Sequence, residues 1–388
     1  MRIALVNMGR VNNAYGGTEK VFFDMANNLS RRGHEVVAIV HDTHRGSPVF
    51  PIDEAVEYHN CKVSMAHNFW LQVHRRVAPL FVDKRNRTKK KIQCKYHPRA
   101  SQIKKLLDGI PPVDVFITFQ ALATYLLLDV LKVKTPVITM NHTLPSYDGD
   151  ENEVFKDSLR KSACLQVLMP EYIDIAKKTF PEADIVAVPN IVPQFSESSS
   201  LEKPVIINVG RISKSIKRQW LIVEAFSKIA ENHPEWSVEL WGEKNEHPKD
   251  TLYLESMIRR LGLQDRVRLC GSTKDVPSVL KEGAIFCFPS AYEGMPLAMT
   301  EAMSMGLPVI GCKECSSVNS IIQDGENGFL CDSSAEGISQ KLDVLMSDFE
   351  LRKKMGAQAK LDMVKYSPDT VWGRWDELIR TIVKSKRS

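Results

Sequence analysis

The sequence lacks any apolar run near the roughly 20 residues that a membrane-spanning helix needs. It has no repeats or low-complexity segments, and its opening, MRIALVNMGR, is too short and ends too abruptly for a secretory signal. We therefore expect a cytoplasmic protein. The 388 residues are 43% hydrophobic and 26% charged, as in soluble globular proteins, and this length predicts two domains.

Cysteines are few and follow no paired pattern. The eight cysteines are scattered along a chain without an export signal, so reduced thiols are expected. Cys312 and Cys315 form a C-x-x-C, but a zinc site needs a second pair of ligands and no second C-x-x-C is present. We predict no metal site.

Acidic residues are almost absent from residues 70–105, where Asp83 stands alone against twelve Lys and Arg. This segment carries a net charge of +11. The whole chain carries +5, so the rest of the chain carries −6. Apolar side chains alternate with the cations, which predicts contact with an anionic membrane surface; an exposed, solvated loop is the alternative. A single basic segment without a recognised motif does not favour nucleic-acid binding. The candidates for membrane contact are Trp70, Arg75, Arg76, Arg85, Arg87, Lys89, Lys90 and Lys91.

Strand-like and helix-like stretches alternate along the chain. RIALVNM (2–8), a helical pattern over 18–32 that ends at Gly33, and EVVAIVHD (35–42) predict a β-α-β unit. Further strands are expected at 114–119, 136–142, 165–170, 184–190, 205–211, 237–242, 266–271, 284–290 and 307–311, and helices near 218–232 and 251–262.

Prolines and serines accumulate over residues 188–204, where the periodicity stops, so we place a linker there. The α/β series on either side of it predicts two doubly wound domains with parallel sheets. The predicted domains are residues 1–192 and 200–367, with a helix over about 368–388 that packs back on the first domain.

The first β-α turn, GRVNNAYGGTEK (9–20), is rich in glycine. Gly16 and Gly17 stand just before a helix, whose free N–H groups and dipole favour an anion such as a pyrophosphate. The turn is not a G-x-G-x-x-G fingerprint, and a tight turn without a ligand is the alternative.

The second domain opens with NVGRISKSIKRQ (208–219). Arg211 follows a strand and Lys217 stands at the start of the next helix, so both side chains are expected on the same edge of the sheet. Two cations there suit a diphosphate, while a solvated basic loop is the alternative.

The stretch SAYEGMPLAMTEAMSMGLPVI (290–310) places Glu293 in a loop after a strand and Glu301 eight residues later. Pro296 suits the first helical turn, so Glu301 should lie within the helix. Carboxylates accept hydrogen bonds from the vicinal hydroxyls of a ribose or hexose, so both residues are candidates for sugar binding. The alternative is that neither binds a ligand, one Glu being favoured near the helix N-terminus by the helix dipole and the other being merely exposed. The amides expected to hold ligand oxygens are those of Gly294, Met295 and Leu297.

Three motifs occur in order after the expected strands: Gly-Gly-x-Glu at 16–19, Arg-x5-Lys at 211–217 and Glu-x7-Glu at 293–301. Together they resemble the retaining, sugar-nucleotide-dependent glycosyltransferases of family 4, whose GT-B fold has two Rossmann-like domains facing a central cleft. The similarity covers most of 204–331, but the N-terminal half only through the first loop, the β-α-β opening and NHTLP (141–145). One position departs from the pattern: the glycine usual after the lysine is Arg218.

The resemblance implies a role for each matching residue. Arg211 and Lys217 would hold the donor diphosphate and neutralise it as it leaves, Glu301 would bind the ribose, and Glu293 would contact the hexose. The turn Gly294, Met295, Pro296 and Leu297 would bind the donor, and the backbone of 271–275 would face the base.

In the N-terminal half, Gly16 and Gly17 would closely approach the phosphate or the transferred sugar. His142 matches a histidine that hydrogen-bonds the donor sugar near the reacting carbon, although a strand-end histidine with local partners is the alternative. The implied catalytic residues are thus His142, Glu293, Arg211 and Lys217.

The implied reaction moves a hexose from a nucleotide sugar, most simply a UDP-sugar, to a lipid-linked or polysaccharide acceptor. It proceeds with retention and without a metal or other cofactor, and the enzyme would sit at the inner face of the cytoplasmic membrane. The alternatives are a catalytically silent sugar-nucleotide-binding module and a GT-B sugar-nucleotide epimerase.

Overall fold

The computed structural model describes the chain apart from residues 15, 63–86, 144–149, 245–246 and 388, and apart from the side chains of 87–89, 150–153 and 386–387. The chain divides into two compact units. The first comprises Met1–Pro189 and Trp372–Ser388, and the second Asn190–Val371. The predicted linker 188–204 contains no helix or strand, and its residues from Asn190 onward belong to the second unit.

The first unit is built on a parallel sheet whose strands lie in the order β3-β2-β1-β4-β5-β6-β7. Its inner strands are buried on both faces, as in β1, where every residue from Ile3 to Asn7 is buried, and this explains their continuous apolar sequences. The edge strands β3 and β7 are only partly buried. The strands are β1 (Arg2–Asn7), β2 (Glu35–Val40), β3 (Glu57–Asn60), β4 (Val115–Thr118), β5 (Val137–Met140), β6 (Cys164–Val167) and β7 (Ile185–Ala187).

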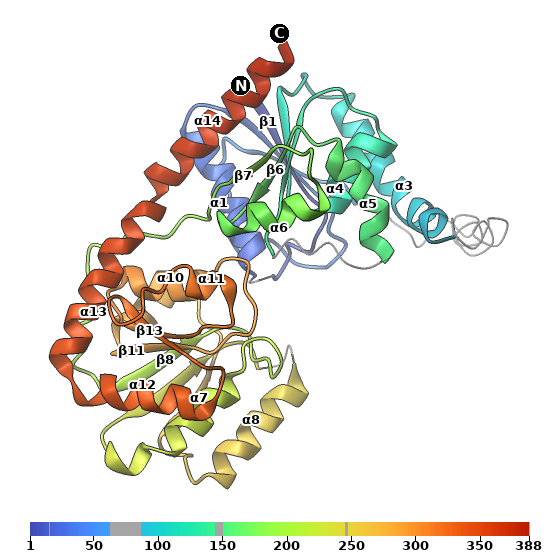
Figure 1. Cartoon of the computed structure of the whole chain (residues 1–388). Coiled ribbons are helices and arrows are strands. Elements are labelled where there is room, and N and C mark those ends of the chain that lie inside the picture. Colours follow the sequence, from blue (N-terminus) through green and yellow to red (C-terminus); the bar gives the residue numbers. More distant parts are fainter. Residues whose placement is uncertain (15, 63–86, 144–149, 245–246, 388) are drawn as a thin grey trace. The chain divides into compact units, whose positions relative to one another are not determined.

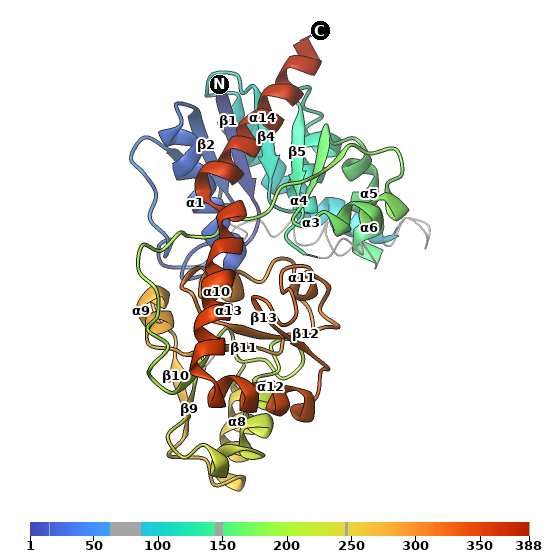
Figure 2. The ribbon, with the colours of Figure 1, turned by 60° about the vertical axis from the view of Figure 1, so that its left-hand side comes forward.

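Helices cover both faces of this sheet. α3, α4 and α5 lie on one side, where they share a core with β1, β2 and β4, and α1 and α14 lie on the other (Figure 1, Figure 2). The helices are α1 (Gly17–Arg31), α3 (Arg87–Leu107), α4 (Ala121–Tyr125) with the π-helical turn η3 (Leu126–Val130), α5 (Asp150–Arg160), α6 (Glu171–Thr179) and α14 (Pro368–Arg387). As predicted, Gly33 ends α1 with a positive φ of 83°.

The second unit is built on a parallel sheet with the order β10-β9-β8-β11-β12-β13. The prediction of two doubly wound parallel sheets is therefore confirmed. The strands are β8 (Val205–Val209), β9 (Ser237–Trp241), β10 (Val267–Gly271), β11 (Ile285–Phe288), β12 (Val309–Cys312) and β13 (Gly328–Cys331).

The helices α7, α8 and α12 bury one face of this second sheet in a single apolar core, and α10 and α11 cover the other face (Figure 1). The helix predicted near 218–232 ends at Ser227 and is followed by a 3-10 turn. The bounds are α7 (Gln219–Ser227), η4 (Ala230–Asn232), α8 (Pro248–Arg260), α9 (Val276–Lys281), α10 (Leu297–Ser304), α11 (Ser316–Asn319), α12 (Ala335–Ser347), α13 (Phe349–Asp362) and η5 (Met363–Tyr366).

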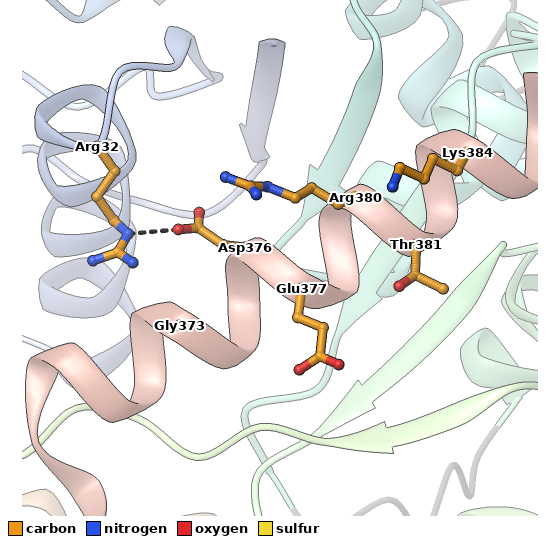
Figure 3. A pocket seen from close by; sticks show the side chains of 7 residues that line it. All are labelled: Arg32, Gly373, Asp376, Glu377, Arg380, Thr381 and Lys384. Atoms are coloured by element: carbon orange, nitrogen blue, oxygen red, sulfur yellow. Dashed lines mark hydrogen bonds and ion pairs between the residues drawn. The ribbon is translucent and has the colours of Figure 1, made fainter.

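The last helix, α14, begins in the second unit, and its residues from Trp372 onward belong to the first. Trp372 and Trp375 are buried there, and Asp376 accepts from Arg32 Nε at 2.7 Å and from His34 Nε2 at 3.1 Å. An ionised carboxylate can only accept, so Nε2 of His34 carries the proton. Figure 3 shows Arg32 reaching toward Asp376, beside an open polar hollow of about 460 Å³.

We predict that Asp376→Asn lowers the free energy of unfolding by about 1–2 kcal/mol, because it replaces a charged acceptor between two donors by a neutral amide. Urea denaturation followed by the fluorescence of the buried tryptophans measures the change. Glu377→Gln, on the exposed face of the same helix, is the matched control and should change it by less than about 0.5 kcal/mol. Equal stability of both variants would contradict the role of Asp376.

Candidate functional site

Each sheet reverses its strand order once, between β1 and β4 in the first unit and between β8 and β11 in the second. Loops that leave the carboxyl ends of two such strands turn to opposite faces of the sheet and open a crevice in which α/β proteins bind ligands. The glycine-rich loop and the motifs at 211–217 and 293–301 follow β1, β8 and β11, and His142 follows β5, next to β4, so each unit is described at that edge.

In the second unit, the loop after β8 is joined to the loop after β11. The carbonyl of Ile216 accepts from the amide of Ala291 at 2.8 Å, and Nε of Arg218 donates to the carbonyl of Pro289 at 2.7 Å. These two bonds flank Lys217 in the sequence, so the backbone on both sides of that lysine is fixed.

Lys217 itself forms an ion pair with Glu293, with 2.5 Å between Nζ and Oε1. The side chains are 18% and 13% exposed, so this is a mostly buried pair. Nζ also lies 5.1 Å from the centre of the Phe288 ring, and the aliphatic part of the side chain packs against Gly210. The structure thus brings together Lys217 and Glu293, to which the sequence assigned separate tasks.

Arg211 lies at the start of the same loop and is exposed. Its carbonyl accepts from Nε2 of Gln219 at 2.9 Å, and the Gln219 side chain also accepts from the amide of Ser213 at 3.2 Å. Gly242, after β9, approaches this loop so closely that a Cβ there would lie 2.1 Å from the carbonyl oxygen of Gly210. Glycine is therefore required at 242 for the loop to keep its path.

The turn before α10 differs from the prediction. Pro296, with φ −78° and ψ 76°, caps the helix from outside its first turn, and the amide of Leu297 donates to the carbonyl of Met295 at 2.9 Å in an inverse γ-turn. The Leu297 amide is therefore engaged within the turn, and its expected place among the ligand-binding amides stays a prediction. The roles of the Gly294 and Met295 amides stay predictions.

The other carboxylate of the motif, Glu301, lies inside α10 as predicted and is 9% exposed. The Glu293 carbonyl accepts from Oγ of Ser317, at the start of α11, at 3.2 Å. Met295 is buried, and its sulfur accepts from the amide of Asn190 at 3.3 Å. The whole turn from 293 to 297 is thus held from several sides.

In the first unit, Asp42 holds the glycine-rich loop after β1. Its carboxylate accepts from the amides of Val11 at 2.8 Å and Asn12 at 2.7 Å, and from both the amide and Nδ1 of His44. Burial disfavours the charged form of Asp42, but these hydrogen bonds outweigh it and lower the pKa to about 2.

Gly16 is the N-cap of α1, and Gly17 is its first residue. A Cβ on Gly16 would lie 2.1 Å from Oε2 of Glu19, so any other residue would displace that carboxylate. The Gly-Gly-x-Glu motif is therefore a local structural unit, in which the glycine makes room for the acid three residues later.

Between β1 and β4, the Gln120 side chain bridges the two strand ends. It donates to Oδ1 of Asn7 at 2.6 Å and accepts from the amide of Met8 at 2.8 Å. The His142 ring stacks on Phe119, with 5.2 Å between ring centres, and its Nε2 is buried with no hydrogen-bond partner among the described residues. Burial lowers the pKa of His142 to about 4, so the ring is neutral near pH 7.

Much of the basic segment 70–105 lies outside the described residues, including Trp70, Arg75, Arg76 and Arg85. Residues from Arg87 onward form α3, which corrects the alternative of a loop for that part. Lys91 and Lys95 are exposed on α3, while Ile92 and Tyr96 are buried against the sheet. Arg87 and Lys89 lie in α3, where their side chains are not described, and Lys90 is partly exposed.

The cysteines show no metal site in the described part of the chain, where no group of three or more His, Cys, Asp or Glu could hold an ion. Cys312 and Cys331 are paired across β12 and β13, and the hydrogen bond from the Cys331 thiol is the main reason that the pKa of Cys312 falls to about 7. The sequence contains one Asp-x-Asp triplet, Asp148 to Asp150, whose side chains are not described. None of the described helices combines the length and apolar character needed to cross a membrane.

Sequence analysis did not identify several residues that shape these edges. Gln120 follows the expected strand 114–119 directly and Gly242 ends the expected strand 237–242, and these positions were an available signal. Asp42 also ends an expected strand, 35–42, but its bonds to backbone amides 30 and 31 residues away left no local pattern. Ser317 gave no signal, because its partner is a carbonyl 24 residues away.

Comparison with known proteins gives a consistent picture. Residues 193–362 match the sequence model of the family described as "Glycosyl transferases group 1". An uncharacterized glycosyltransferase of Haemophilus influenzae is 22% identical over 94% of this chain and 96% of its own. The amylovoran biosynthesis glycosyltransferase AmsD of Erwinia amylovora is 21% identical over the same shares of the two chains.

Solved structures share the fold. Sucrose-phosphate synthase from Thermosynechococcus elongatus superposes with a TM-score of 0.79 at 15% identity and covers 99% of both chains. HepE from Anabaena, solved with UDP and glucose, superposes with a TM-score of 0.70 at 15% identity, covering 98% of this chain and 100% of its own.

We predict that Asp42→Asn lowers the free energy of unfolding at pH 7 by about 2–3 kcal/mol. The asparagine has only one acceptor oxygen, so its NH2 group would face either the amides of Val11 and Asn12 or the amide of His44. The folded-state pKa lies below the ordinary value of 3.8, so the stabilisation is complete above about pH 4 and is lost as the pH falls toward 2. Urea denaturation of both proteins at several pH values should therefore show their difference narrowing over that range.

Asp108→Asn provides the control, because Asp108 is an exposed carboxylate paired with Lys104 within one helical turn. It should cost less than about 0.5 kcal/mol at any pH. A difference between wild type and Asp42→Asn that stayed constant from pH 5 to pH 2 would refute the role of the Asp42 charge.

Proposed function

We propose that this chain, whose residues 193–362 belong to the glycosyl transferases group 1 family, moves a hexose from a nucleotide sugar to a polysaccharide or lipid-linked acceptor. The family match and relatives over nearly the whole chain make it a glycosyltransferase with the GT-B fold. The name of AmsD, a polysaccharide biosynthesis enzyme, supports the acceptor class, and the UDP bound to HepE supports a UDP-sugar donor.

The observation that carries the proposal is the Lys217–Glu293 pair at the point where the second sheet reverses its strand order. A largely buried ammonium interacts more strongly with an anion than an exposed one does, because less water screens it. We propose that Lys217, together with Arg211, holds the donor diphosphate. Glu293, which already touches Lys217, would accept hydrogen bonds from the hexose hydroxyls.

The remaining donor contacts extend along the same turn and helix. We propose that Glu301 binds the ribose hydroxyls and that the amides of Gly294 and Met295 bind donor oxygens. In the N-terminal domain, which we propose to bind the acceptor, Gly16 and Gly17 would approach the phosphate or sugar. His142, neutral near pH 7, would exchange hydrogen bonds with the sugar through its buried Nε2.

The proposed reaction retains the configuration of the anomeric carbon. The bond from that carbon to the diphosphate oxygen breaks, the acceptor hydroxyl oxygen bonds to the same face, and its proton passes to the departing phosphate oxygen. Because that phosphate oxygen takes the proton, no protein base is required. Negative charge builds up on the departing diphosphate, where Arg211 and Lys217 would stabilise it. We propose that family 4 is the subfamily and that no metal takes part.

Membrane association is the last part of the proposal. α3 buries Ile92, Tyr96, Ala100 and Ile103 and exposes Lys91, Lys95 and Lys105, so one side of the helix is basic and open to solvent. Such a surface is attracted to anionic lipid headgroups, by about 1 kcal/mol for each suitably placed cation. A lipid-linked acceptor would be presented there, at the inner face of the cytoplasmic membrane.

The donor site is tested by thermal shift with nucleoside diphosphates and their sugars. A ligand at about 100 times its dissociation constant stabilises the protein by roughly 2.7 kcal/mol. We expect uridine diphosphate to raise the melting temperature of the wild type. Lys217→Ala should weaken its binding at least tenfold, because the charge that faces the diphosphate is lost, whereas Glu293→Ala should keep diphosphate binding but lose sugar transfer.

Lys214→Ala is the matched control for these variants, because Lys214 lies in the same loop but is exposed and stacks on Tyr253. No stabilisation of the wild type by any nucleoside diphosphate or its sugars would reject the donor site. Binding without transfer to any acceptor would favour the silent module, and donor turnover without acceptor the epimerase. Because Asp148-Gly149-Asp150 is present in the sequence, activity that vanishes with EDTA would reject a metal-free reaction.

The membrane proposal predicts cosedimentation with vesicles that contain phosphatidylglycerol, and release at high salt. The double variant Lys91→Glu, Lys95→Glu should bind these vesicles at least about thirtyfold more weakly, because it loses two cations that contribute about 1 kcal/mol each and adds two negative charges. Lys353→Glu, Lys354→Glu, on the exposed side of α13, is the control with the same change of charge. Equal binding by the two double variants would remove α3 from the membrane-binding surface.

A further inference from the structure

Arg218 has a backbone conformation that is unusual for its residue type. Its φ is 51° and its ψ is 39°, in the left-handed region that favours glycine. It is the N-cap of α7, and its amide donates to the carbonyl of Ser213 at 2.7 Å, which closes the loop after β8. An arginine kept in this strained conformation must be held by its surroundings.

The guanidinium group supplies that hold. Nε donates to the carbonyl of Pro289 at 2.7 Å, at the end of β11, and one terminal nitrogen donates to Oγ of Ser333 at 3.1 Å, just after β13. Ser333 Oγ donates in turn to the carboxylate of Glu314 at 2.6 Å, which follows β12. One side chain therefore links the loop after β8 to the carboxyl ends of the next three strands.

These contacts bear directly on the neighbouring Lys217. A lysine side chain is flexible, so the position of its backbone decides which groups its ammonium can reach. Ile216 is tied to Ala291 on one side of Lys217, and Arg218 is tied to Pro289 on the other. Both ties lead to the loop that carries Glu293, so the Lys217 backbone is placed relative to its ion-pair partner.

We propose that Arg218 is a positioning residue that sets the Lys217 ammonium for the donor diphosphate by clamping its loop to the end of β11; this rests on the proposed function. A glycine at 218 would adopt the same backbone conformation without strain, but it could not supply the clamp. Arg218 thus adopts the left-handed backbone conformation that a glycine would also adopt, and in addition its side chain bonds to Pro289 and Ser333, which a glycine could not do.

The experiment compares wild type with Arg218→Gly, which keeps the left-handed backbone accessible and removes the guanidinium. Two quantities are measured: the dissociation constant for uridine diphosphate by calorimetry, and the exchange rates of backbone amides by NMR without ligand. We expect at least tenfold weaker binding and at least tenfold faster exchange of the Ala291 amide, which is bonded to Ile216. The amide of Gly242, bonded to Gly271 across the sheet edge, should exchange at the wild-type rate.

Two further variants separate charge from geometry. Arg218→Lys retains the positive charge but cannot reach both Pro289 and Ser333 in the same way, so it should recover only part of the affinity. Ser333→Ala removes the second contact without touching the loop and should weaken binding about threefold. Lys132→Gly, an exposed residue with φ of 55° in the first unit, controls for relief of backbone strain and should change neither quantity.

Wild-type affinity and wild-type exchange at Ala291 in Arg218→Gly would overturn the proposal. Faster exchange at Gly242 and Ala291 alike would overturn it too, because it would indicate general loosening of the domain. If the wild type binds no nucleoside diphosphate, the proposed function fails, while the exchange rates still decide whether Arg218 clamps the loop.

Discussion

The loops at the switch point of the second sheet depend on one mostly buried ion pair, between Lys217 and Glu293. Removing an ammonium and a carboxylate from water is costly, and their attraction compensates for this only when the geometry is well fixed. That geometry comes from the backbone, because the loops after β8 and β11 are bonded to each other on both sides of the lysine. The pair keeps a cation and a hydrogen-bond acceptor side by side at the sheet edge, as the proposed donor site requires.

The two units hold the loops at the point of strand-order reversal with different side chains. In the second unit, charged side chains hold the loops at the switch point, as with Lys217 and Arg218. In the first unit, neutral amides and a low-pKa carboxylate do so, through Gln120 between the strand ends and Asp42 under the glycine-rich loop. The first unit also keeps His142 uncharged.

Most strands and the doubly wound class could be predicted, because strands buried on both faces leave continuous apolar runs. β3 was missed because Glu57–Asn60 is polar and only partly buried, and β13 because a short run after two turn glycines carries little periodicity. Pro296, expected in the first turn of α10, lies one residue before the helix as its N-cap. A proline suits either side of a helix start, and only the bond from Leu297 to Met295 decided it.

The sequence by itself determined the fold class and the residue types at the ends of the strands, because hydrophobic periodicity marks buried strands and helices and motif spacing places residues after them. Only the tertiary structure decided which of those residues meet. The contact between Lys217 and Glu293 joins residues 76 apart, and the link from Arg218 to Ser333 joins residues 115 apart. The order in which strands pair brings residues so far apart in the sequence close together. No local sequence pattern encodes the final position of a flexible side chain.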